Sequence, residues 1–170
     1  MSLRLTSMIA AVLLLAACES TPTDTGMATT GGGAGGAGTS STQGPRPGTN
    51  EHLVATVGDR VFFDTDRSTV RPDGRATLDK QSAWLKQFPS TTVTVEGHAD
   101  ERGTREYNLA LGNRRATAAK NYLVATGINP NRVTTISYGK ERPAVVGSNE
   151  QAWSQNRRAV TVVTSSQPGS

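Results

Sequence analysis

Residues 93–116 read VTVEGHADERGTREYNLALGNRRA, and this stretch passes through a strand, a loop and the start of a helix. Val93 and Val95 alternate with polar residues, which predicts a strand with one buried face. Asp100 and Glu101 follow in a loop, residues 97–103, that has a glycine at each end. A long helix is expected over residues 104–126, because Gly127 ends its periodic pattern.

The phase of this helix singles out one arginine. At about 100° per residue counted from Tyr107, one face of the helix collects an apolar stripe, made of Leu111, Ala119, Tyr122 and Leu123. Asn108 and Arg115 fall inside the stripe, whereas Arg114 falls at its edge. Because a buried guanidinium is costly without an anion, we expect Arg115 to meet a carboxylate or phosphate. The partner belongs either to a ligand or to the chain, as in an Arg115–Asp100 salt bridge without a ligand.

Residues 51–170 contain every aromatic residue and form the predicted domain. Strands are expected at 61–63, 91–96, 133–138 and 158–164, helices at 72–88 and 104–126, and a helical turn at 149–154. Alternating strands and helices indicate an α/β fold. The connection before the last strand is too short for a parallel crossover. The fold class is therefore α/β, βαβαβ-type, with two main helices packed on one face of a mixed four-stranded sheet.

The N-terminal third of the chain has a different composition. Residues 1–17 combine Arg4 with a short apolar run and read as a signal peptide. Small residues before the lone Cys18 resemble the lipobox of bacterial lipoproteins, in which the cysteine carries lipid; the alternative is an ordinary signal peptide that contains a cysteine. Residues 18–50 are rich in Gly, Ser, Thr and Pro and contain no Leu, Ile, Val or aromatic residue, which predicts a flexible tether.

Composition excludes several classes of protein. One cysteine among 170 residues rules out a disulfide framework and a cysteine-rich zinc site. The net charge of +4 is too small to indicate nucleic-acid binding. His98, Asp100 and Glu101 have no second His or Cys nearby, so we expect no metal, and no motif supplies a catalytic nucleophile. We therefore expect neither a cofactor nor an enzyme.

Several motifs together resemble the OmpA-like peptidoglycan-binding domain, and most of all its peptidoglycan-associated lipoproteins. The likeness covers about residues 60–163. It rests on the stretch quoted above together with VFFD at 61–64, SYGKERP at 137–143 and NRRAV at 156–160. Arg105 departs from the pattern, since relatives often have proline there.

The resemblance implies a ligand and a site. The domain would bind the meso-diaminopimelate residue of the peptidoglycan stem peptide without cutting it. Asp100 would hold the ammonium of that residue, and Arg115 would hold its carboxylate. The backbone at Phe63 and Asp64 would add hydrogen bonds, with Ala99, Asn108 and Leu109 as further site residues. One carboxylate and one guanidinium a few ångströms apart suit a free amino-acid end.

The resemblance also implies location and partners. Lipid on Cys18 would hold the chain in the outer membrane, facing the periplasm, as part of the Tol–Pal system that acts in cell division. TolB would compete with the wall, and Glu101, Arg102 and Tyr107 are expected near its surface. Three hypotheses stay open: an anchor that binds the wall, a protein whose main ligand is TolB, and an enzyme acting on peptidoglycan.

Overall fold

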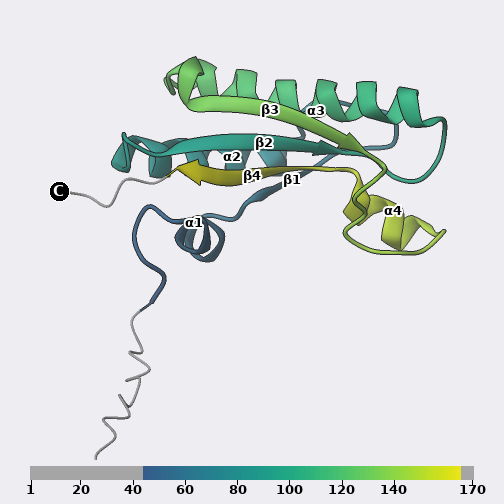
Figure 1. The fold of residues 1–170 in the computed structure, drawn as a ribbon, viewed down its shortest axis with the longest axis horizontal. Helices are drawn as coiled ribbons and strands as arrows, with labels where there is room; N and C mark the ends of the chain where they lie inside the picture. Colours follow the sequence, from purple (N-terminus) through teal and green to yellow (C-terminus); the bar gives the residue numbers. More distant parts are fainter. Residues whose placement is uncertain (1–43, 166–170) are drawn as a thin grey trace, which may run out of the picture. The chain divides into compact units, whose positions relative to one another are not determined.

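The computed structural model describes residues 44–165, so the predicted signal peptide, Cys18 and most of the predicted tether lie outside the described residues. One mixed sheet organises the described part (Figure 1). Its strands are β1 (Arg60–Phe62), β2 (Thr92–His98), β3 (Val133–Gly139) and β4 (Arg158–Ser165). They lie in the order β1-β4-β2-β3, and β4 runs antiparallel to both of its neighbours. β2 and β3 are parallel, so the predicted mixed four-stranded sheet is confirmed.

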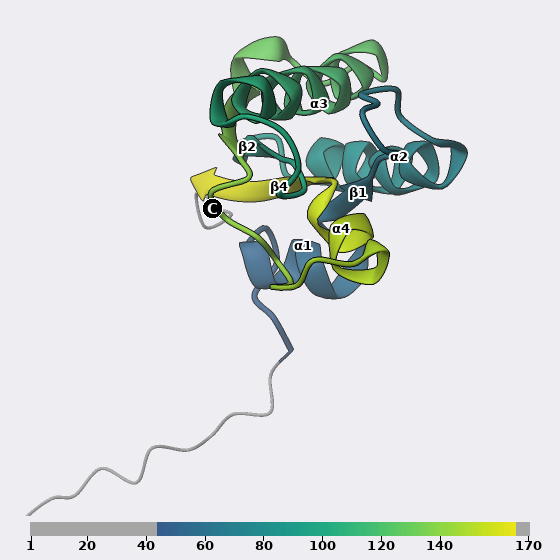
Figure 2. The same ribbon diagram turned by 90° about the vertical axis from the view of Figure 1, so that its right-hand side faces the viewer.

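Two long helices, α2 (Pro72–Gln87) and α3 (Arg105–Ala125), pack on one side of the sheet (Figure 2). Pro72 and Asp73 occupy the first turn of α2, and Thr104 caps α3 by accepting a hydrogen bond from the Tyr107 amide. The core between helices and sheet contains buried apolar side chains, among them Val61, Leu78, Leu85, Val93, Val95, Ala116, Leu123 and Val133. These are the faces that the alternation of β2 and the spacing in the helices predicted.

Two short helices were only partly foreseen. α4 (Glu150–Asn156) is the expected helical turn, with Asn149 as its N-cap. α1 (Asn50–Thr56) was not predicted and begins one residue before the expected domain boundary. The Asn50 side chain accepts a hydrogen bond from the Val163 amide, on the part of β4 that lies beyond its pairing with β1. α1 therefore covers a length of strand edge that would otherwise be unpaired.

α3 approaches the sheet closely where two glycines meet. A Cβ atom added to Gly97 of β2 would lie 1.8 Å from the backbone oxygen of Gly112 of α3, so only glycine fits at this crossing. Arg115 follows Gly112 by almost one helical turn. The contact therefore holds the backbone of α3 near enough to β2 for the Arg115 side chain to reach the end of that strand.

Candidate functional site

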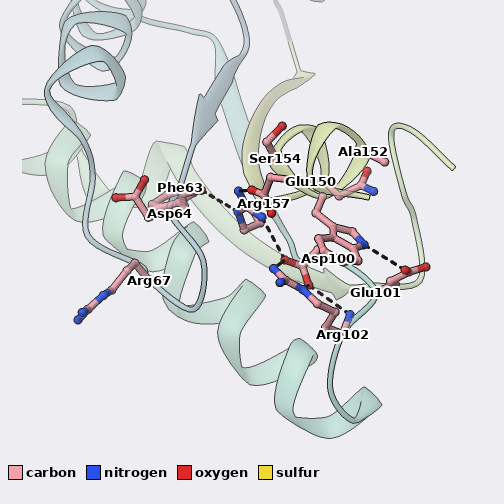
Figure 3. A network of polar contacts seen from close by, with 12 residues as sticks. Phe63, Asp64, Arg67, Asp100, Glu101, Arg102, Glu150, Ala152, Ser154 and Arg157 are labelled. Atoms are coloured by element: carbon pink, nitrogen blue, oxygen red, sulfur yellow. Dashed lines mark hydrogen bonds and ion pairs between the residues drawn. The ribbon is translucent and has the colours of Figure 1, made fainter. Parts of the chain in front are cut away.

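Asp100 lies just beyond the end of β2 and is 7% exposed. Its Oδ1 accepts hydrogen bonds from the Arg102 amide and Nε, both at 3.2 Å, and its Oδ2 accepts one from Arg102 Nη2 at 2.7 Å. Arg157 Nη1 lies 3.4 Å from the same Oδ2 (Figure 3). Burial alone would raise the pKa of Asp100, but the hydrogen bonds from Arg102 and Arg157 hold the pKa below its ordinary value. Asp100 is thus an ionised, nearly buried carboxylate.

Arg157 fixes this carboxylate from the side of the sheet. Its side chain is 7% exposed and also donates to the Phe63 carbonyl, at 3.2 Å, and to Glu150 of α4. In return the Phe63 amide donates to the Arg157 carbonyl at 2.9 Å. The sequence did not identify Arg157 as a site residue, although it lies in the motif NRRAV at 156–160. Strand alternation could not have singled it out, because Arg157 and the neighbouring Arg158 are both buried, at 6% and 7% exposure.

Arg115 is fully buried, as its helical phase predicted, and it is among the largest such side chains in the described residues. Its guanidinium donates to three backbone carbonyls: Arg67 at 2.8 Å, His98 at 2.8 Å and Asp64 at 3.1 Å. Desolvation lowers the pKa of Arg115 to about 10, so the group still carries its charge near neutral pH.

The expected partner of Arg115 needs correction. Within the described part of the chain it forms no ion pair, so the alternative of an Arg115–Asp100 salt bridge is wrong. The carbonyl dipoles of the loop after β1 and of His98 replace the expected anion. Such a set satisfies the hydrogen bonds of the guanidinium, while the carboxylates of Asp100 and Asp66 act on its charge without contacting it.

The loop that covers Arg115 is itself held by a tyrosine. Asp66 has a left-handed backbone, with φ +56°, which is uncommon for a residue other than glycine. Its carboxylate accepts a hydrogen bond from the Tyr107 hydroxyl of α3. Tyr107 is 44% exposed and does not face the core. The ring instead bridges α3 to the Asp66 loop, with the Arg114 guanidinium 5.8 Å from its centre.

A pocket of about 360 Å³ opens between these groups. Its lining is Thr65, Asp66, Asp100, Arg102, Gly103, Tyr107, Asn108 and Leu111. Among the predicted site residues, Asp100 and Asn108 therefore share one pocket with Arg102 and Tyr107. Asn108 is 1% exposed and donates to the Arg102 carbonyl at 2.7 Å, which fixes the loop backbone beside Asp100.

The other predicted residues lie around this pocket and not in its lining. Phe63 is 1% exposed, with the Arg115 guanidinium 5.4 Å from its ring centre. Asp64 is exposed and reaches Arg71 at 3.5 Å. Ala99 faces a separate pocket beside Glu101, and the Leu109 carbonyl accepts a hydrogen bond from Ser137 at 2.7 Å. Glu101, expected on a partner surface, is exposed and accepts a hydrogen bond from Trp153 at 3.0 Å (Figure 3).

No group of three acidic, histidine or cysteine residues suited to a metal ion occurs within residues 44–165. His98 has both ring nitrogens buried without a hydrogen-bond partner. Burial, and to a lesser degree the positive charges of Arg158 and Arg142, lower the pKa of His98 to about 4. The ring is therefore neutral near pH 7, and its 3.5 Å approach to Glu96 is not an ion pair. None of the helices in the described range is long and apolar enough to cross a membrane.

Comparison with known sequences gives a consistent set of relatives. Residues 62–157 match the model of the OmpA family. A peptidoglycan-associated lipoprotein of Rhizobium meliloti is 58% identical over 117 residues, which are 69% of this chain and 66% of that protein. One from Mesorhizobium japonicum is 49% identical over 156 residues, or 92% of this chain and 89% of that protein.

A solved structure agrees with these relatives. The peptidoglycan-associated lipoprotein from Burkholderia pseudomallei superposes with a TM-score of 0.62 at 38% identity, covering 66% of this chain and 93% of that one. The C-terminal domain of Helicobacter pylori MotB, at 19% identity and a TM-score of 0.59, shares the fold.

Proposed function

The chain belongs to the OmpA family, and from this membership we propose that its domain binds peptidoglycan noncovalently and does not cleave it. The proposed ligand is the stem peptide, recognised at meso-diaminopimelate. The free end of that residue carries an ammonium and a carboxylate on one carbon. The name carried by the relatives from R. meliloti and M. japonicum supports this ligand class.

The observation that carries the proposal is the ionised Asp100 at a pocket, with a buried guanidinium close behind it. Asp100 would pair with the ligand ammonium, and Arg115 with the ligand carboxylate. Arg115 Nη1 bonds the carbonyl of His98, two residues before Asp100, so both charges belong to one end of β2. The backbone around Phe63 and Asp64 would add hydrogen bonds, and Ala99, Asn108 and Leu109 would shape the surroundings.

Arg115 can meet a ligand only if its cover moves. The carbonyls of Asp64 and Arg67 occupy two sides of the guanidinium. A ligand carboxylate would replace at least one of them and would supply the anion that Arg115 lacks. That exchange is favourable because a charged acceptor forms a stronger hydrogen bond than a neutral carbonyl, and a bidentate one is stronger again.

We further propose that lipid on Cys18 holds the chain in the outer membrane and that residues 18–50 carry the domain to the wall. Tethering raises the effective concentration, so weak binding at one site still gives a firm link. A role in the Tol–Pal system follows from the same proposal. Arg102 and Tyr107 line the pocket and Glu101 is exposed nearby, so a TolB molecule bound there would cover the wall site.

Cosedimentation with purified peptidoglycan sacculi tests the proposal. The full chain in detergent is compared with Asp100→Ala and with the matched neighbour Arg114→Ala, each checked for folding by circular dichroism. We expect the wild type and Arg114→Ala to pellet and Asp100→Ala to stay in solution. A soluble wild type, or three proteins that pellet alike, would refute the site and favour TolB as the main ligand. Release of muropeptides would instead support the enzyme hypothesis.

A further inference from the structure

Asp100 already holds a cation, and that cation belongs to the chain. Its two oxygens receive four hydrogen bonds, of which the Arg102 side chain provides two and the Arg102 amide a third. An ionised carboxylate offers about four acceptor positions. An incoming ammonium therefore finds no free position on Asp100 and must displace a donor that is present.

We propose that Arg102 is an internal counter-cation that the ligand's ammonium replaces, and that this exchange makes the pocket selective for ligands with a free primary amine. The inference rests on the proposed function and assigns a specificity-determining residue to the same site. The family resemblance placed Arg102 near a surface for TolB, whereas this inference gives Arg102 a role in ligand binding.

The environment of Arg102 allows its side chain to leave. The side chain is 40% exposed, and its guanidinium lies 4.1 Å from the centre of the Trp153 ring. Glu101 and Glu150 are close enough to act on the charge of Arg102, and Glu101 is itself held by Trp153. A short rotation away from Asp100 thus keeps an aromatic face and two carboxylates beside the guanidinium.

The other donors on Asp100 are fixed. The Arg102 amide belongs to a loop whose carbonyl is held by Asn108 at 2.7 Å. Arg157 is 7% exposed and bound by the Phe63 carbonyl and Glu150 as well as by Asp100. Asp100 therefore keeps its orientation when the Arg102 side chain moves, and the position that becomes free faces the pocket.

Selectivity follows from the charge balance of this exchange. A ligand ammonium that displaces Arg102 leaves Asp100 paired with a cation, as before. A neutral group in the same place would leave a nearly buried carboxylate with weaker compensation, which is costly. A ligand whose amine is acetylated can therefore bind only with Arg102 still in place, and it gains nothing from Asp100.

The test uses isothermal titration calorimetry on the full chain in detergent. The probes are a muramyl tripeptide ending in meso-diaminopimelate and the same peptide with that free amine acetylated. Arg102→Gln removes the competing charge and keeps the backbone amide. Arg105→Gln is the matched control, because Arg105 is 62% exposed and pairs with Glu141 away from the pocket.

We expect Arg102→Gln to tighten binding of the amine-bearing peptide about 3- to 10-fold and to leave the acetylated peptide unchanged. Arg102→Lys should return the affinity toward that of the wild type, because an ammonium can also pair with Asp100. Arg105→Gln should match the wild type with both probes.

Three outcomes overturn the inference and can be told apart. If the wild type binds the amine-bearing peptide but Arg102→Gln binds it equally or more weakly, Arg102 is a ligand contact or a bystander, and the proposed function stands. Equal tightening of both peptides would likewise reject the exchange. If the wild type binds neither peptide, the proposed function fails, and the exchange fails with it.

Discussion

The two charged ends of the candidate site are held in opposite ways. Asp100 is neutralised by side chains, one of which is 40% exposed and can rotate. Arg115 is fully buried and donates hydrogen bonds only to backbone carbonyls. Two of them, at Arg67 and Asp64, are 48 and 51 residues away in sequence, and the third, at His98, is at the end of β2. A rotamer change therefore frees the carboxylate, whereas the guanidinium is freed only by movement of the chain.

This difference shows how one site divides two tasks. The carboxylate can exchange its cation quickly and suits the first contact with a ligand. The guanidinium joins the loop after β1 to α3 and the end of β2, so its hydrogen bonds also stabilise the fold. Mutations at the two ends should consequently differ in how strongly they affect stability.

Arg115→Ala should give the largest loss of stability, about 3–5 kcal/mol, because it leaves one buried and two partly buried carbonyls without donors and opens a cavity. Urea unfolding monitored by circular dichroism measures the loss. Arg115→Lys should recover only part of it, since an ammonium on a thinner side chain cannot reach three carbonyls in the plane of a guanidinium. Full recovery with lysine would show that charge alone matters and would remove the contrast with Asp100.

His98 connects the two ends, because it lies two residues before Asp100 and its carbonyl accepts a hydrogen bond from Arg115. The His98 ring is buried and neutral. Its pKa falls from 6.5 to about 4 in the folded state, so the unfolded chain binds more protons between these pH values. Stability should therefore fall as pH drops from 6.5 to 4, by up to about 3 kcal/mol, and this contribution should level off below that range. In His98→Gln the unfolding free energy, measured at several pH values, should lose this slope; an unchanged slope would contradict the depressed pKa.

Asp100→Asn should cost less stability than Arg115→Ala, about 1–2 kcal/mol at pH 7, because Asn keeps an acceptor for Arg102 and Arg157. The pKa of Asp100 is lowered from 3.8, so its stabilising effect is complete above pH 3.8 and is lost as pH falls through the native value. The difference between Asp100→Asn and wild type in urea unfolding should shrink accordingly in acid. A loss as large as that of Arg115→Ala would mean that the two ends are equally structural.

Tyr107→Phe should have the smallest effect on stability, within about 1 kcal/mol, because the lost hydrogen bond to Asp66 lies at the surface. It should nevertheless speed amide hydrogen exchange in the Asp66 loop, which that bond holds over Arg115. Arg114→Ala is the control, since Arg114 lies beside the Tyr107 ring, 5.8 Å from its centre, and its removal leaves the bond from Tyr107 to Asp66 in place. Unchanged exchange in Tyr107→Phe would show that the Arg115 carbonyl bonds alone close the loop.

Much of the fold could be predicted because its signals are local. The alternation at Val93 and Val95, Pro72 at a helix start and Gly127 past a helix end each placed an element within a few residues. α1 was missed because seven residues carry little periodicity.

For the site, the sequence by itself determined that Arg115 is buried and Arg114 is not, since 3.6 residues per turn fix the face of each. It also placed Asp100 at the end of a strand. Only the tertiary structure decided which groups Asp100 and Arg115 contact. The strand order β1-β4-β2-β3 carries Arg157 to Asp100 across 57 residues of sequence, and the Gly97–Gly112 contact sets Arg115 among carbonyls of a distant loop. Local patterns encode which face is buried, whereas the identity of a partner depends on contacts between elements that are far apart in the chain.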